Sequence, residues 1–123
     1  MFGSTVVPFV ASVVLGSAPL TPLAGPAALY FEKVPVRTSS EATCLRFARD
    51  VARDQAFTNT HSSGAEVAGE KGGAYVAITC VGRGTQPAIA IVMSVAPDFA
   101  AARNVGRAVA AKIKTITCID APC

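Results

Sequence analysis

Four cysteines and a single histidine are the residues of this 123-residue chain whose chemistry could define a site. The cysteines are Cys44, Cys80, Cys118 and Cys123, and none of them forms a C-x-x-C pair. Zinc sites commonly use such close pairs together with histidine, but His61 is remote in sequence from all four. An even set of cysteines in an exported chain favours two disulfides. We therefore predict cross-links, and no bound metal or cofactor.

Candidate catalytic groups are few. His61 is followed by Ser62 and Ser63, but adjacent residues of an extended chain point to opposite sides, so this run does not place a base beside a nucleophile. Glu66 and Glu70 could act as an acid and a base only in a dry cleft, which no feature of the sequence indicates. The motifs of zinc proteases, serine hydrolases and nucleotide-binding loops are absent from the sequence. We predict no catalytic residue.

The amino-terminal segment decides how the cysteines are interpreted. The first 31 residues carry no charged side chain, and they contain the apolar run 6–15 (VVPFVASVVL) followed by small and turn-forming residues. This pattern is typical of an export signal. Small residues stand at the two specificity positions before Ala28, and no proline lies next to a cut made there, so we predict a signal peptide over 1–27 and a single domain over 28–123. An uncleaved membrane anchor is the alternative, although prolines interrupt the segment.

Composition agrees with a small exported domain. The formal net charge of +3 is too mild to indicate nucleic-acid binding, and the sequence has no tryptophan and few aromatic residues. The predicted location is the periplasm or the outside of a bacterial cell, with no stable membrane insertion after cleavage. Small apolar side chains bury little area each, so cross-links would add useful stability.

Hydrophobic periodicity predicts the elements that carry these residues. A strand is expected over 29–36, followed by a helix that a Thr38–Glu41 capping box opens. Further strands are expected over 65–68, 74–81 and 88–96, and then a second helix capped by Asp98. The tail TCIDAPC could add a final strand.

These elements predict an α+β fold. Its order is β-α-β-β-β-α, and it forms a two-layer sandwich in which two helices cover one face of a mainly antiparallel sheet of three to four strands. This plan is similar to ferredoxin-like folds. If the strands alternate in direction, Cys80 lies near the end of the second helix, which favours Cys80–Cys118 with Cys44–Cys123. The rival pairing is Cys44–Cys80 with Cys118–Cys123.

The uncovered face of the sheet is the expected contact surface, because it is too apolar to stay comfortably in water. We predict a non-enzymatic binding or interaction protein that forms a homodimer or binds another protein there. A small periplasmic enzyme, a thiol-redox protein and an inhibitor of an extracellular enzyme are the alternatives. The basic side of the second helix could add to the surface, whereas RNA binding would need more stacking aromatic residues. The residues assigned to the surface are Tyr75, Ala77, Thr79, Ala90, Val92, Arg103 and Arg107.

Overall fold

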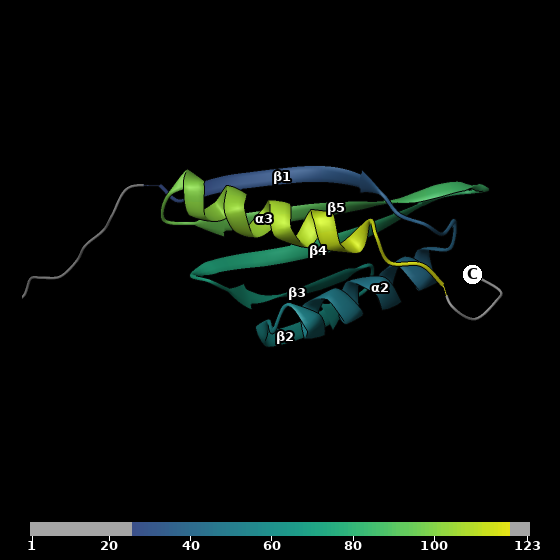
Figure 1. The fold of residues 1–123 in the computed structure, drawn as a ribbon, viewed down its shortest axis with the longest axis horizontal. Helices are drawn as coiled ribbons and strands as arrows, with labels where there is room; N and C mark the ends of the chain where they lie inside the picture. The colour runs from purple at the N-terminus through teal and green to yellow at the C-terminus, as the bar shows by residue number, and fades with distance from the viewer. Residues whose placement is uncertain (1–25, 119–123) are drawn as a thin grey trace, which may run out of the picture.

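A computed structural model describes residues 26–118 of the chain. The elements in order are β1 (Ala28–Pro35), α2 (Glu41–Asp54), β2 (Thr58–Ser63), β3 (Glu66–Lys71), β4 (Ala74–Arg83), β5 (Gln86–Ala96) and α3 (Phe99–Ile113). The strands form one antiparallel sheet in the order β1-β5-β4-β3-β2 (Figure 1). Strand β1 begins at the residue predicted to start the mature chain; residues 1–25 of the predicted signal peptide lie outside the described part.

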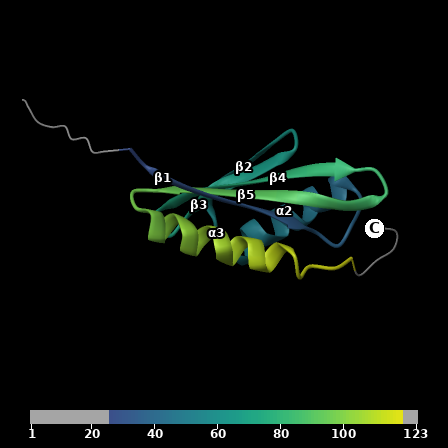
Figure 2. The same cartoon turned by 90° about the horizontal axis from the view of Figure 1, so that it is seen from above.

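The α+β class and the placement of both helices on one face are confirmed (Figure 2). The number of strands is wrong in the prediction, because the described chain has five and its order is β-α-β-β-β-β-α. Four consecutive strands form a meander, and β1 joins it beside β5. The two-layer plan of ferredoxin-like folds is present, but their split β-α-β arrangement is not.

The strand that the prediction missed is β2. Its sequence, TNTHSS, is exposed at every position, so it lacks the alternation of apolar and polar residues that marks a half-buried strand. It is an edge strand that pairs with β3, with a register irregularity between Thr58 and His61. Gly64, with a φ of 58°, lies in the turn between the two strands, where a left-handed backbone conformation is needed.

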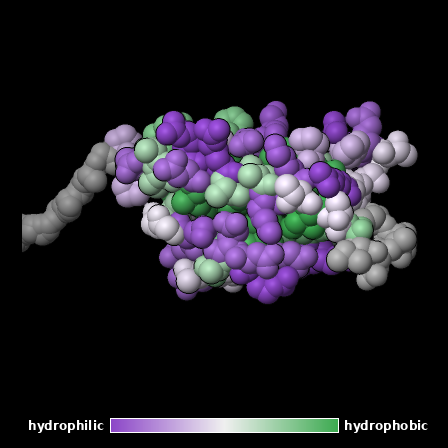
Figure 3. Space-filling model, viewed as in Figure 1, coloured by the Kyte–Doolittle hydropathy of each residue, from purple (hydrophilic) through white to green (hydrophobic). Residues whose placement is uncertain are grey.

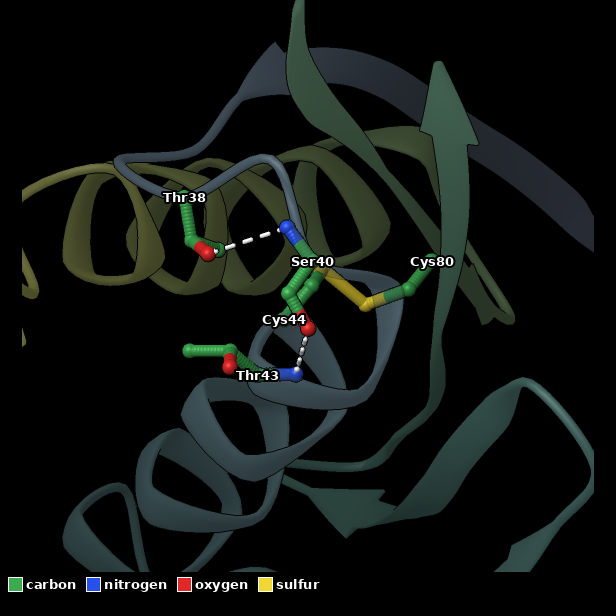
Figure 4. The surroundings of a disulfide bond; sticks show 5 residues. All are labelled: Thr38, Ser40, Thr43, Cys44 and Cys80. Atoms are coloured by element: carbon green, nitrogen blue, oxygen red, sulfur yellow. Dashed lines mark hydrogen bonds between the residues drawn. A yellow bond between two sulfur atoms is a disulfide. The ribbon is translucent and has the colours of Figure 1, made fainter. Parts of the chain in front are cut away.

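Each helix has a side-chain cap, but one cap differs from the prediction. Helix α2 is capped by Ser40, whose Oγ accepts a hydrogen bond from the Thr43 N–H, and not by the predicted Thr38–Glu41 box. Thr38 instead accepts from the Ser40 N–H and so holds the residue that caps the helix (Figure 4). Asp98 caps α3 as predicted, because its carboxylate accepts from the Ala101 N–H. The tail is irregular up to residue 118, where the description ends.

The core lies between the helices and the sheet. Helix α3 packs over β1 and β5, and α2 packs over β3 and β4. Small residues allow α3 to approach closely: a Cβ placed on Gly106 would lie 2.5 Å from the Tyr30 ring. Fully buried Ala48, Ala90 and Ala102 serve the same close packing.

A disulfide between Cys44 and Cys80 crosses this core and ties α2 to β4, with Cα atoms 6.0 Å apart (Figure 4). The favoured pairing, Cys80–Cys118 with Cys44–Cys123, is therefore wrong. The reason is the arrangement of the helices: α2 packs over β3 and β4 and brings Cys44 to Cys80, whereas α3 packs mainly over β1 and β5. Cys118 is itself disulfide-bonded, and Cys123 lies outside the described residues.

Candidate interaction face

The sheet has one face without helices, which we call the open sheet face. The register of the strands places alternate residues of each strand on it. From β1 to β2, the first row across this face is Leu29, Val95, Tyr75, Glu70 and Thr58. The second row is Phe31, Met93, Ala77, Ala68 and His61, and the third is Lys33, Ile91, Thr79, Glu66 and Ser63. A shorter fourth row holds Pro35, Ile89 and Val81.

Strand β5 carries its larger apolar side chains on the open sheet face. Its inward residues are Ala88, Ala90, Val92, Ser94 and Ala96, all buried against the helices. Its outward residues are Ile89, Ile91, Met93 and Val95, which are half-buried or exposed. Larger apolar residues are usually the more buried ones. Strand β5 therefore points small side chains toward the helices and large apolar side chains outward. This is the reverse of what a strand with a solvated outer face requires.

The exposed apolar residues concentrate on the same face. Phe31 is 58% exposed, Leu29 54% and Tyr75 44%. Of the large apolar residues that are exposed within residues 26–118, all but Phe99 belong to the open sheet face. The opposite side of the molecule, where the helices lie, is mostly hydrophilic, with apolar residues visible between the two helices (Figure 3). The two sides of the molecule thus differ sharply in polarity.

The side chains of Tyr75 and His61 meet over β3 on the open sheet face. The Tyr75 hydroxyl and Nε2 of His61 are hydrogen-bonded at 3.3 Å, and the two ring centroids are 6.4 Å apart. Ala68 lies between them on the intervening strand and has no exposed area, although no helix covers it. The pair therefore covers Ala68.

The predicted surface residues divide into three groups. Tyr75, Ala77 and Thr79 belong to the open sheet face, with Ala77 shielded by its larger neighbours. The assignment of Ala90 and Val92 is wrong, since both are fully buried beneath the helices. Arg103 and Arg107 are exposed on α3, the helix that packs on the other face of the sheet, so they belong to a different surface.

A single register irregularity explains the error on β5. Arg83 pairs with Gln86 across the turn at Gly84, and an unbroken ladder from that pair would place Ala90 beside Thr79. The register shifts between Val81 and Arg83, so Ile91 is the residue beside Thr79. A one-residue shift moves every side chain to the other face. The sequence prediction thus missed the outward-facing residues of β5 and, on β1, Leu29 and Phe31. The alternation of small and large residues along 88–96 could have identified the outward-facing residues of β5.

The structure brings no catalytic set together. His61 is exposed and paired with Tyr75, while Glu66 and Glu70 are separated from each other along β3. Tyr30 donates a hydrogen bond of 2.7 Å to Glu32, which raises the pKa of the phenol and keeps it protonated. Between residues 26 and 118, no group of three or more histidine, cysteine or acidic residues could hold a metal ion.

A hollow of about 800 Å³ lies where the first row of the open sheet face meets the start of β1. Pro26, Ala56, Tyr75 and Val95 line it. Its charged lining residues are Glu70 and Lys71, and the Lys71 ammonium already donates a 2.9 Å hydrogen bond to the Gln55 carbonyl. No set of polar groups in the lining identifies a ligand.

The comparisons with known proteins leave the site to be interpreted from its own chemistry. No family model matches the sequence, and neither a curated protein nor a solved structure shows significant similarity to it. No helix of residues 26–118 is long and apolar enough to cross a membrane.

Proposed function

We propose that this protein is an exported, non-enzymatic binding domain that takes up a partner protein on its open sheet face. The observation that carries the proposal is the orientation of the side chains on β5. Ile89, Ile91 and Met93 point outward, and alanines point toward the helices. An apolar surface of this kind lowers its free energy when another surface excludes water from it. A contact surface is therefore the simplest physical reason for the arrangement.

The shape and charge of the face favour a protein as the partner. Small-molecule sites are concave and carry a few convergent polar groups. The hollow beside the first row has no such set of polar groups, and the centre of the face is a run of side chains across adjacent strands. An anionic membrane surface attracts basic residues, but Glu66 and Glu70 place two carboxylates on one margin of the face and Lys33 supplies one cation. Exposed Phe31 and Tyr75 are of the residue type that is enriched in the centres of protein interfaces.

The disulfide supports the exported location. The Cys44–Cys80 bond is an internal link of the kind that persists in oxidising compartments. A thiol-redox function would require an accessible sulfur, yet Cys44 has no exposed area and Cys80 is 1% exposed. The bond is thus placed for stability, and the redox alternative receives no support from its position.

Site-directed photo-crosslinking tests the proposal. The full-length chain would be produced in bacteria with a photoreactive phenylalanine analogue at Phe31, and a control would carry the analogue at Ala111, an exposed residue on the outer side of α3. We expect a defined protein adduct from position 31 that mass spectrometry identifies, and none from position 111. Equal crosslinking at the two positions, or no protein adduct at position 31, would contradict the proposal.

A further inference from the structure

We infer that the partner on the open sheet face is a second copy of this chain, related by a two-fold axis that runs parallel to the strands between β5 and β4. The inference rests on the proposed function and identifies the partner. In this arrangement β1 of one copy lies over β3 of the other, and β5 lies over β4. The contact is the same from both sides, as a two-fold interface requires.

The position of Lys33 sets the axis. Lys33 lies beside Ile91, between Phe31 and Pro35 along β1, so a surface that covers these apolar residues also contacts the lysine side chain. A charge that loses water needs a countercharge. Among the described residues, the carboxylates on this face are Glu66 and Glu70, and both belong to β3. A second copy that places its β3 over β1 supplies this countercharge.

The strand register also brings the opposite charges of the two copies to the same level. Lys33 and Glu66 lie in the same row across the sheet, at the level of Ile91 and Thr79. A half-turn about an axis between β5 and β4 exchanges the positions of β1 and β3 in that row, so each Lys33 faces Glu66 of the second copy. Within one chain the two residues are three strands apart, about 14 Å, and do not pair. Sheets that pack face to face cross at about 30°, an offset that the long lysine side chain can span.

The apolar residues match as well. The same half-turn places Val95 over Tyr75 of the second copy, and Met93, a large side chain, over the small Ala77. Phe31 comes to lie on the Tyr75–His61 pair that covers Ala68, which is an aromatic contact. Large side chains on the β1–β5 half of the face thus meet a half that carries the small residues Ala77 and Ala68.

The other two-fold arrangement is unfavourable. An axis across the strands, at the level of Phe31 and His61, exchanges the first and third rows. Glu66 would then face Glu70 of the second copy, twice in each dimer. Like charges that face each other in an interface oppose association. The charges on the face therefore select the axis that is parallel to the strands.

The area is sufficient for a concentration-dependent dimer. Four strands about 4.8 Å apart, and about eight residues long at about 3.3 Å per residue, cover roughly 500 Å² per copy. Two copies together bury about 1,000 Å², which is at the lower limit for a specific interface. We therefore expect a dimer that dissociates on dilution.

Charge reversal with mixing tests this geometry. In Lys33→Glu homodimers two glutamates face each other at each contact, and in Glu66→Lys homodimers two lysines do. We expect each variant to dimerise about tenfold more weakly than the wild type, because attraction becomes repulsion at two equivalent contacts. A mixture of the two variants restores opposite charges at both contacts, so it should form a heterodimer with nearly wild-type affinity. Sedimentation equilibrium of the oxidised mature chain measures the masses.

Controls separate the possible results. Lys112→Glu reverses an exposed charge on α3 and should leave the wild-type dimer unchanged. A wild-type dimer whose single variants stay weak after mixing would overturn the two-fold axis, while the open sheet face would remain the contact surface. A wild-type chain with single-chain mass at every concentration would overturn the second copy as partner; a photo-crosslink from Phe31 to another protein would then still support the proposed function.

Discussion

The two faces of the sheet are built from alternate residues of the same strands, yet they are filled in opposite ways. On the helix side, small side chains such as Ala90 and Ala102, together with Gly106, allow the helices to approach the sheet closely. On the open sheet face, Phe31, Ile91 and Met93 are large and incompletely covered. The helix side thus closes the core of one chain, whereas the open sheet face leaves large apolar side chains available for the association that we propose.

The largest expected effect is on the helix side, where the disulfide lies. Replacing Cys44 and Cys80 together by alanine removes the cross-link between α2 and β4, which joins two residues 36 positions apart in sequence. The loop-closure model gives a loss of about 4 kcal/mol in the free energy of unfolding. Urea unfolding of the mature chain, compared with the oxidised wild type, measures it. A loss below about 1 kcal/mol would mean that the bond contributes little to the stability of this core.

A matched pair of isoleucines compares the two faces directly. Ile78 is fully buried on the inward side of β4, and Ile91 is half-buried on the outward side of β5. Ile78→Ala should cost about 3 kcal/mol of unfolding free energy, because it leaves a cavity in the core. Ile91→Ala should cost about 1 kcal/mol or less in dilute protein, and it should weaken self-association severalfold. Equal losses of stability with no effect on association would contradict the distinction between the faces.

Of the three stability tests, a substitution at Gly106 should have the smallest effect. Alanine is favoured over glycine in a helix by about 1 kcal/mol, but at position 106 its Cβ would lie 2.5 Å from the Tyr30 ring. Overpacking of this kind costs about 1–3 kcal/mol, so Gly106→Ala should be destabilising by about 1 kcal/mol on balance. At Gly82 a Cβ would meet Glu41 at an ordinary 3.6 Å, which makes Gly82→Ala a control with little effect. Thermal unfolding of the two variants would show the difference.

The hydrophobic periodicity of the sequence was sufficient to predict the elements that pack against the core. The burial of Phe47, Ala48 and Val51 on α2 follows the helical spacing of the sequence, and Asp98 caps α3 as its position before an apolar run predicts. Strand β2 could not be predicted in this way, because it buries no side chain and is held to β3 by the backbone. Edge strands of this kind leave no hydrophobic pattern in the sequence.

The candidate surface was only partly predictable. The exposure of Tyr75 and Thr79 on an uncovered face followed from the placement of both helices on one side. The register of β5 depends on one irregularity between Val81 and Arg83, which short-range patterns do not reveal. The disulfide pairing depends on which helix lies over β4, a matter of tertiary packing that residue spacing leaves open.

Oxidation of Met93 measures most directly whether the outward residues of β5 become covered by a second chain. Met93 is the single methionine among residues 26–118, and it points from β5 onto the open sheet face. With dilute peroxide and mass spectrometry, we expect slow oxidation in concentrated wild-type protein. The rate should rise on dilution and in Lys33→Glu, which weakens the proposed dimer and lies beside Ile91, but not in Lys112→Glu, which reverses an exposed charge on α3. An oxidation rate that is independent of protein concentration and unchanged by Lys33→Glu would contradict the account.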